Sequence, residues 1–348
     1  MAADNTISAP MPRVSLRERP GLVFGFSVIL LLLTALASVL IGAVRIPLDE
    51  ALRILSGQGG AHEAILLQVR LPRVVLAFSV GAGLALCGAL MQTFFRNPLA
   101  DPALIGVSAG GALGAVSLIV LGGGLASLFM LPLAAFVGSA AATALVFALA
   151  RRDGHVDATT MLLAGIAVNA LAGAGIGFVT YLATDAQLRN LTFWSLGSLS
   201  AATWPTALVL ALCAALAAAL AWRLAKPLNA LLLGDSEARH LGVNVERLKL
   251  GLILLTCLVA GAAVALCGVI GFVGLVAPHA ARLLLGPDHR VMVPLSALLG
   301  ATLLAGADVI ARTVVAPTEL PIGVLTAFIG APLFLWLLRR RGGAAFHA

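Results

Sequence analysis

Two ionisable residues, Asp308 and Arg312, lie four positions apart near the end of a long apolar segment. This spacing places both side chains on one face of a helix, where they can form an ion pair. Ionisable groups inside a membrane-length segment are costly, so each is a candidate functional residue. Asp308 could relay protons in a carrier driven by a proton gradient. We favour the alternative, a structural ion pair that also positions Arg312.

His279 is a second candidate, because it follows an interrupted apolar segment that contains Gly271, Gly274 and Pro278. Glycine and proline in such a segment predict a broken helix, which is tolerated where protein or a water-lined cavity satisfies the backbone. His279 could bind a metal or a substrate. We favour the simpler interpretation that it satisfies backbone groups freed by the break.

Residues for catalysis are missing from the sequence. A phosphate-binding loop requires Gly-Lys before Ser or Thr, whereas the two lysines, Lys226 and Lys249, follow Ala225 and Leu248. The cysteines lie in apolar segments without metal-ligand spacing: Cys87, Cys213, Cys257 and Cys267. We expect no catalytic residue, metal or cofactor in this chain, so that any ATP and Mg²⁺ would be bound by a partner subunit.

The composition indicates a membrane protein. Of the 348 residues, 61% are hydrophobic and 11% are charged, and the mean hydropathy is +1.06. A helix needs roughly 20 apolar residues to cross a bilayer, and segments such as 21–44 stay apolar over that length, unlike the alternating strands of a barrel. The basic residues behind the net charge of +7 lie mostly between apolar segments, as topology signals do. We expect an all-α polytopic protein in lipid that binds no nucleic acid.

We expect one membrane domain over residues 1–348 with about ten transmembrane helices. The expected spans are 21–44, 71–95, 103–121, 126–150, 159–183, 204–224, 249–270, 272–286, 293–312 and 321–338. The count is most open at the third and fourth spans, which only Gly122–Gly124 separates, and at the short eighth span. Glycines at 106, 110 and 114, and at 173 and 177, have the spacing that permits close helix packing.

Ala-Leu-Cys-Gly occurs at 85–88 in the second span and again at 265–268 in the seventh. Inverted repeats are common in transporting membrane proteins, so we hypothesise that spans 2–5 and 7–10 have inverted-repeat character. With both termini in the cytoplasm, sixteen of the 22 basic residues lie inside, as the positive-inside rule requires. Residues 1–20 then form a cytoplasmic tail, and 185–200 form a short or re-entrant helix on the outer side.

A polar segment at 234–247, between the sixth and seventh spans, predicts two short cytoplasmic helices. Asp235 or Ser236 can cap the first, Gly242 can end it in the left-handed conformation, and the second would begin near Asn244. This rigid unit could dock into a groove on a partner. A solvated loop is the alternative, and the order of caps and glycine favours docking.

Arg70 and Arg73 flank Pro72 at the expected start of the second span. Pro72 predicts that the helix begins there, which places both cations at the positive end of the helix dipole. They could simply extend to the interface. We favour an acidic partner outside the membrane, because the placement is otherwise unfavourable.

Five ordered motifs carry a resemblance to a known family: 70–73, 97–102 with 106–111, 234–242, 271–279 with Arg282, and 319–324. Together they resemble the FecCD-type permeases, the membrane subunits of type II ABC importers for iron chelates, heme and cobalamin. The resemblance implies a homodimeric permease in the bacterial inner membrane. Two ATPase subunits would bind its cytoplasmic face, and a binding protein its periplasmic face.

The resemblance also implies roles for individual residues. Arg70, Arg73 and Arg312 would dock the binding protein, and their charges would steer association more than they supply affinity. ATPase coupling falls to Asp235, Ser236, Glu237, Arg239, Gly242 and Arg247. The cytoplasmic gate falls to Asn97, Leu99 and Thr159, and the pathway lining to Ala164, Ala167, Gly173 and Gly177.

Within the family, residues 185–199 look most like the heme permeases, and the small residues of the fifth span suit a wide apolar passage. We therefore expect heme as the transported substrate, delivered by a periplasmic heme-binding protein. A ferric siderophore or cobalamin is the alternative. An alternative of another class is a proton-coupled secondary carrier that uses Asp308.

Overall fold

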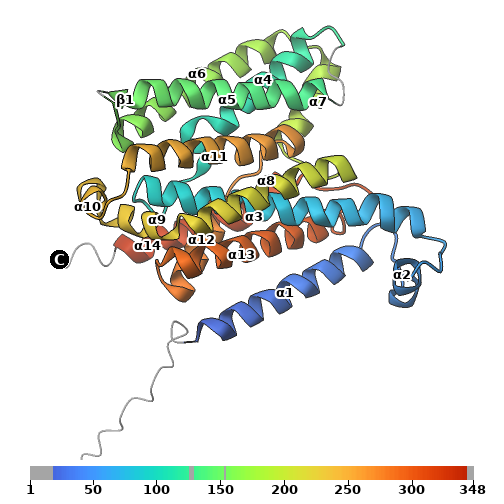
Figure 1. Ribbon diagram of the computed structural model, residues 1–348. Helices are drawn as coiled ribbons and strands as arrows, with labels where there is room; N and C mark the ends of the chain where they lie inside the picture. Colours follow the sequence, from blue (N-terminus) through green and yellow to red (C-terminus); the bar gives the residue numbers. More distant parts are fainter. Residues whose placement is uncertain (1–18, 125–128, 153, 343–348) are drawn as a thin grey trace, which may run out of the picture.

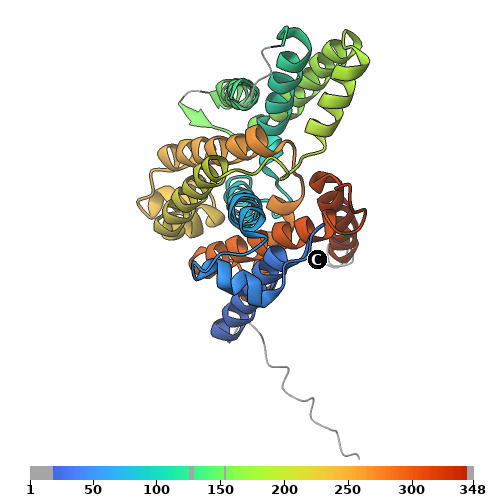
Figure 2. The ribbon, with the colours of Figure 1, turned by 90° about the vertical axis from the view of Figure 1, so that its right-hand side faces the viewer.

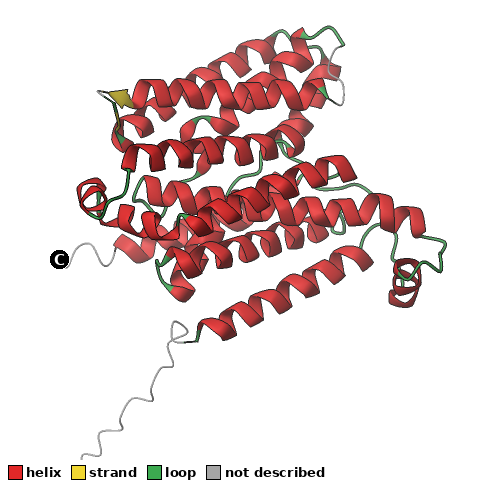
Figure 3. Cartoon of the chain, in the orientation of Figure 1, coloured by secondary structure: helices red, strands yellow, loops and turns green. Residues whose placement is uncertain are grey.

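The structure is a computed structural model that describes residues 19–124, 129–152 and 154–342. In that part of the chain, the regular structure consists of fourteen α-helices, a π-helical turn, a 3-10 turn (η3, Pro102–Ile105) and one small hairpin (Figure 3). The hairpin pairs β1 (Arg151–Arg152) with β2 (His155–Val156). Most of the expected tail, residues 1–18, lies outside the described residues.

Ten helices occupy the ten expected apolar segments. They are α1 (Pro20–Leu40), α3 (Leu71–Phe94), α4 (Val107–Leu121), α5 (Met130–Ala150), α6 (Ala158–Tyr181), α8 (Trp204–Arg223), α11 (Val245–Cys267), α12 (Val273–Leu285), α13 (His289–Ala311) and α14 (Ile322–Gly342). Seven described helices are long and apolar enough to cross a membrane, whereas α4, α12 and the apolar part of α14 are shorter. Two of these short helices, α4 and α12, stand where the sequence left the count open.

Polar caps set where several of these helices begin. Asp157, Thr203, Asn244 and Asp288 each accept a hydrogen bond from a backbone N–H in the first turn of α6, α8, α11 and α13 respectively. A capping side chain satisfies a donor that the helix leaves open. These caps therefore place polar residues where an apolar helix starts.

The central helix is α3, against which α8, α11, α12 and α13 pack (Figures 1 and 2). Its most apolar window is 83% buried, against 17% for α1 and 28% for α6. Close backbone contacts fix α3: a Cβ on Gly81 would meet the backbone of Gly300, and one on Gly88 would meet the backbone of Gly274. Small residues at such crossings are what allow helices to approach.

The glycine pairs of the sequence behave in two ways. Gly110 and Gly114 pack on the backbone of α5, as expected from their spacing. Gly173 and Gly177 of α6 have no atom within 4 Å of an added Cβ. That side of α6 is open, so within one chain this pair does not make the close packing expected of it.

Helix α3 does not begin at Pro72. A π-helical turn, η2 (Ile65–Arg70), precedes it and makes one continuous helix of 30 residues, Ile65–Phe94. Arg70 and Arg73 therefore lie inside a helix, and neither stands at a free N-terminus. The expected conflict with the helix dipole is wrong for this reason.

Four short helices lie at the two ends of the bundle: α2 (Leu48–Leu55), α7 (Asp185–Ser195), α9 (Ala225–Leu233) and α10 (Asp235–His240). Figure 1 shows α2 and α7 at one end, and α10 at the other with the start of α1 and the end of α14. We call these the α2 end and the α10 end. The sequence analysis missed α2, whose Glu50 pairs with His62 at 2.9 Å.

The expected helix break separates α11 from α12. Residues 268–272 are not helical, and both Gly268 and Phe272 have positive φ, whereas Pro278 lies inside α12. The carbonyl of Cys267 accepts from the N–H of Ser198 at 2.8 Å, and the N–H of Ile322 donates to Gly197 at 3.1 Å. The loop after α7 thus satisfies backbone groups at the end of α11 and the start of α14.

A glycine substitution tests the close crossing of α3 and α12. Gly88→Ala should lower stability by about 1–3 kcal/mol, because the new methyl group overlaps a backbone. Gly173→Ala is the matched control, since the added Cβ meets nothing within one chain. Thermal unfolding of the purified protein in detergent measures both, and equal melting temperatures would contradict the crossing.

Candidate functional site

A buried charge cluster lies at the α2 end, centred on Arg73. The Arg73 guanidinium donates to the Asp308 carboxylate over 2.8–3.1 Å and to Glu319 at 2.8 and 2.9 Å. Only 7% of Arg73 is exposed. Two-pronged bonds of this kind fix geometry as well as charge, so Arg73 joins α3, α13 and the segment that precedes α14.

The other two arginines tie α1 to this cluster. Arg312 donates to the backbone oxygen of Ser38 at 2.7 Å and to its hydroxyl at 2.8 Å. Arg70 donates to the carbonyl oxygens of Val39 and Val44. The Nε of Arg312 lies 3.5 Å from Asp308, which confirms the ion pair that we favoured from their spacing.

The acidic partner that we expected outside the membrane lies within the chain itself. Asp308 and Glu319 neutralise Arg73, and Arg70, Arg73 and Arg312 are each only 4–7% exposed. The arginines are therefore not surface cations in this structure, and binding-protein docking at these residues stays a prediction.

Glu319 is the accessible member of the cluster, and its role was missed. Its side chain is 38% exposed, whereas that of Asp308 is 2% exposed. The hydrogen bonds that Arg73 donates lower the pKa of the Glu319 carboxyl below its ordinary value. The sequence offered one signal, because Glu319 opens the fifth family motif.

Glu319 also separates two cavities at the α2 end. One, of about 150 Å³, is lined by residues that include Arg70, Arg73 and Arg312. The other, of about 480 Å³, is lined by residues that include Phe193, Trp194 and Pro321. A movement of Glu319 therefore alters both the arginine cluster and the aromatic cavity beside α7.

At the α10 end, one short helix stands where two were expected. Helix α10 begins at Asp235 after Gly234, without a side-chain cap, and Gly242 follows it with φ of +83° as expected. Asn244 caps the long helix α11, so the second short helix is wrong. The exposed side chains around α10 are Leu233, Ser236, Glu237, Arg239, His240, Leu241, Asn244 and Arg247.

The expected gate residues lie at the same end. Asn97 and Thr159 are exposed and Leu99 is half-buried. Asn97 accepts a hydrogen bond from the N–H of Leu99 at 3.0 Å, which orders the turn after α3. Thr159 sits in the first turn of α6, where Asp157 accepts from the N–H and hydroxyl of Thr160 at 2.6 and 2.7 Å.

The pathway residues of α6 divide between its two faces. Ala167, Gly173 and Gly177 are exposed on the open side of the helix. Ala164 is 8% exposed and belongs to the hydrophobic core, because this face of α6 packs on α4 and α5. Within one chain Ala164 is therefore not available to line a passage.

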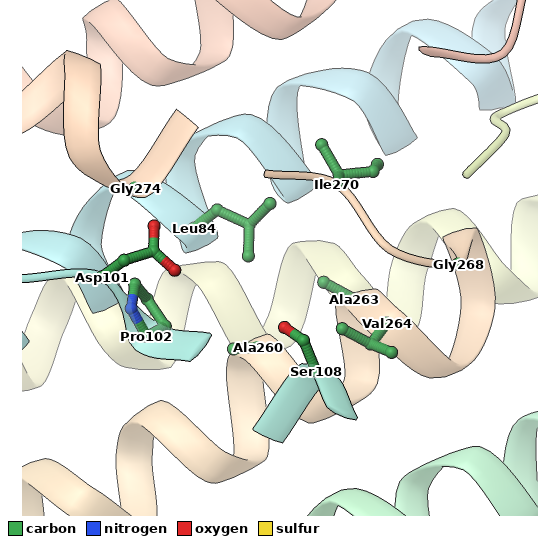
Figure 4. Close-up of a pocket in the computed structure, with 10 residues that line it drawn as sticks. All are labelled: Leu84, Asp101, Pro102, Ser108, Ala260, Ala263, Val264, Gly268, Ile270 and Gly274. Atoms are coloured by element: carbon green, nitrogen blue, oxygen red, sulfur yellow. The ribbon is translucent and has the colours of Figure 1, made fainter. Parts of the chain in front are cut away.

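A cavity enclosed in the bundle is small. Leu84, Asp101, Ser108 and Ile270 are among the residues around it (Figure 4). Its volume is about 20 Å³, room for about one water molecule. It cannot hold a macrocyclic substrate.

Comparison with known proteins gives relatives over nearly the whole chain. The hemin transport system permease protein HmuU of Yersinia pestis is 47% identical, covering 93% of this chain and 97% of its own length. The vitamin B12 import system permease protein BtuC of Klebsiella pneumoniae is 41% identical, covering 92% and 94%. A solved metal-chelate type ABC transporter in an inward-facing conformation has a TM-score of 0.82 at 34% identity, covering 92% and 99%.

The bundle and these relatives define a class: the chain is a multi-pass membrane permease of the ABC importer type. The profile of the FecCD transport family matches residues 30–340. The chain belongs to the FecCD transport family, which confirms the resemblance drawn from the five motifs. A proton-coupled secondary carrier is accordingly wrong, and Asp308 is held in ion pairs with Arg73 and Arg312.

A double-mutant cycle tests the buried cluster. Removing one partner of a buried ion pair costs about 3–5 kcal/mol, so Arg73→Met and Asp308→Asn should each destabilise the protein strongly. The double variant should lose less than the sum of the two, by about 0.5–3 kcal/mol. Chemical denaturation in detergent measures the cycle, and strictly additive losses would show that the two side chains do not interact.

Proposed function

We propose that this permease carries heme from a periplasmic binding protein to the cytoplasm, as a homodimer with two ATPase subunits in the bacterial inner membrane. The observation that supports heme is the 47% identity to a hemin permease, against 41–43% to cobalamin permeases. The chain contributes the passage, and ATP and Mg²⁺ are bound by the ATPase partner.

The open side of α6 supports a passage between two copies. The enclosed cavity of about 20 Å³ is far too small for a tetrapyrrole. Gly173 and Gly177 present bare backbone on an unpacked helix face, beside Ala167. A second copy facing this side would complete a passage lined here by small residues, which suits a wide apolar substrate such as heme.

Helix α10 supports an ATPase contact. Leu233 and Leu241 are 66% and 64% exposed on either side of it, at the end of the bundle where α1 starts and α14 ends (Figure 1). Exposed apolar residues beside Ser236 and Glu237 fit a groove on a partner that excludes water. In this proposal the partner hydrolyses ATP, and the mechanical effect of hydrolysis reaches the permease at α10.

The cluster around Arg73 supports docking of an acidic partner by exchange. A carboxylate of the binding protein would replace Glu319 on Arg73, entering the cavity that Arg70 and Arg312 also line. Released Glu319 would then move in the aromatic cavity beside α7. One exchange of ion pairs on Arg73 would thus both dock the binding protein and rearrange the α2 end of the bundle.

Reconstituted uptake tests the substrate. The permease, its ATPase and its binding protein in liposomes should accumulate heme only with ATP. A ferric siderophore and cobalamin serve as competing substrates in parallel vesicles. ATP-dependent uptake of one of these alone would keep the importer and reject heme.

Substitution of Glu319 tests the exchange. Glu319→Gln removes the competing charge while it keeps the shape, so the binding protein should bind more tightly by roughly tenfold, the scale of a charge-assisted hydrogen bond. Glu63→Gln, at another carboxylate of the α2 end, is the matched control. Surface plasmon resonance on permease in nanodiscs gives both affinities, and weaker binding by Glu319→Gln would show that Glu319 itself contacts the partner.

A further inference from the structure

Glu246 and Lys249 lie one turn apart on α11 and bridge the same two elements. Glu246 accepts from the backbone N–H of Val156 at 3.0 Å and pairs with Arg239 of α10 at 3.0 Å. Lys249 donates to the carbonyl of Val156 at 2.9 Å and pairs with Asp235 of α10 at 2.5 Å. Two side chains thus hold both polar backbone groups of one residue in β2 and two charged residues of α10.

The burial of Lys249 makes this arrangement specific. Its side chain is 3% exposed, and a buried ammonium that loses its partner is strongly destabilising. Its Nζ also lies 5.7 Å from the centre of the Phe94 ring, within the range of a cation–π contact. Lys249 is therefore fixed between α10, β2 and the last residue of α3.

These contacts lead to both expected gate segments. Val156 is followed by Asp157, which caps α6 and so sets the position of Thr159. On the other side, Asp235 lies 4.0 Å from Arg96, the residue before Asn97. A displacement of α10 that keeps its ion pairs must move the entrance of α6.

We propose that Glu246 and Lys249 are positioning residues that transmit the displacement of α10 to the gate through Val156. The inference rests on the proposed docking of an ATPase at α10. It makes α11 the connection between that surface and α6. Neither residue touches the substrate, and their role is to keep hydrolysis and gate opening together.

Lys249→Met in the reconstituted complex tests the connection. Methionine fills the space of the lysine stem but cannot donate to Val156 or Asp235. Heme transported per ATP hydrolysed should fall roughly tenfold, within the range by which residues between coupled sites alter coupling. ATP hydrolysis itself should continue. Lys226→Met is the matched control, because Lys226 is the other lysine and is exposed on α9, and Lys249→Arg should retain coupling since it keeps the donors.

Hydrogen exchange supplies a readout that does not depend on transport. Addition of the ATPase subunit to the wild-type permease should change deuterium uptake at 234–242 and at 151–162. In Lys249→Met the first change should remain and the second should be lost. Glu246→Gln, which keeps the acceptor for Val156 but loses the charge pair, should weaken the second change and serves if Lys249→Met does not fold.

The outcomes separate the two levels of the proposal. If Lys249→Met keeps both its transport per ATP and its response at 151–162, the connection through α11 is wrong. If the wild type shows no ATP-dependent uptake of heme while the exchange response behaves as expected, the substrate is wrong and the connection stands. If the ATPase alters neither segment of the wild type, docking at α10 and the connection both fail.

Discussion

The constraint on which this structure depends is that lipid offers no hydrogen bonds. Each polar group in the membrane must find its partner inside the protein. Two polar clusters meet this requirement for many of the charged groups. Arg73 pairs with Asp308 and Glu319 at one end of the bundle, and Lys249 pairs with Asp235 and donates to Val156 at the other. Between these ends, glycine contacts and apolar packing predominate, with single polar contacts such as that of the Ser139 hydroxyl with the carbonyl of Val107 at 2.8 Å. These two polar clusters therefore hold the helices together at the two ends of the bundle.

The same constraint explains what the sequence could predict. Ten apolar segments, their helical form and the break before α12 follow from length, composition and glycine, because a membrane leaves few alternatives. The left-handed turn at Gly242 after α10 could also be predicted, because glycine readily adopts positive φ. Five ordered motifs indicated the family, which the comparisons confirmed.

The errors have local physical causes. Pro72 is typical of a helix start, but the π-helical turn η2 precedes α3, so the helix is already formed when the chain reaches Pro72. The partner of Arg73 was sought outside because Asp308 and Glu319 lie more than 230 positions away in sequence, and separation gives no sign of contact. Asn244 correctly indicated a helix start, but a cap carries no information on helix length, and the helix that begins there is the long α11.

The glycine contacts of α3 make the centre of the bundle stiffer than its periphery. At Gly81 and Gly88 backbone meets backbone, with no side chain that could change rotamer between them. Close-packed elements of this kind shift as units and do not deform gradually. The peripheral α6 is far less enclosed and packs along one face only, on α4 and α5. We therefore expect α3, α12 and α13 to stay as one stationary frame during transport, while α6 tilts against it.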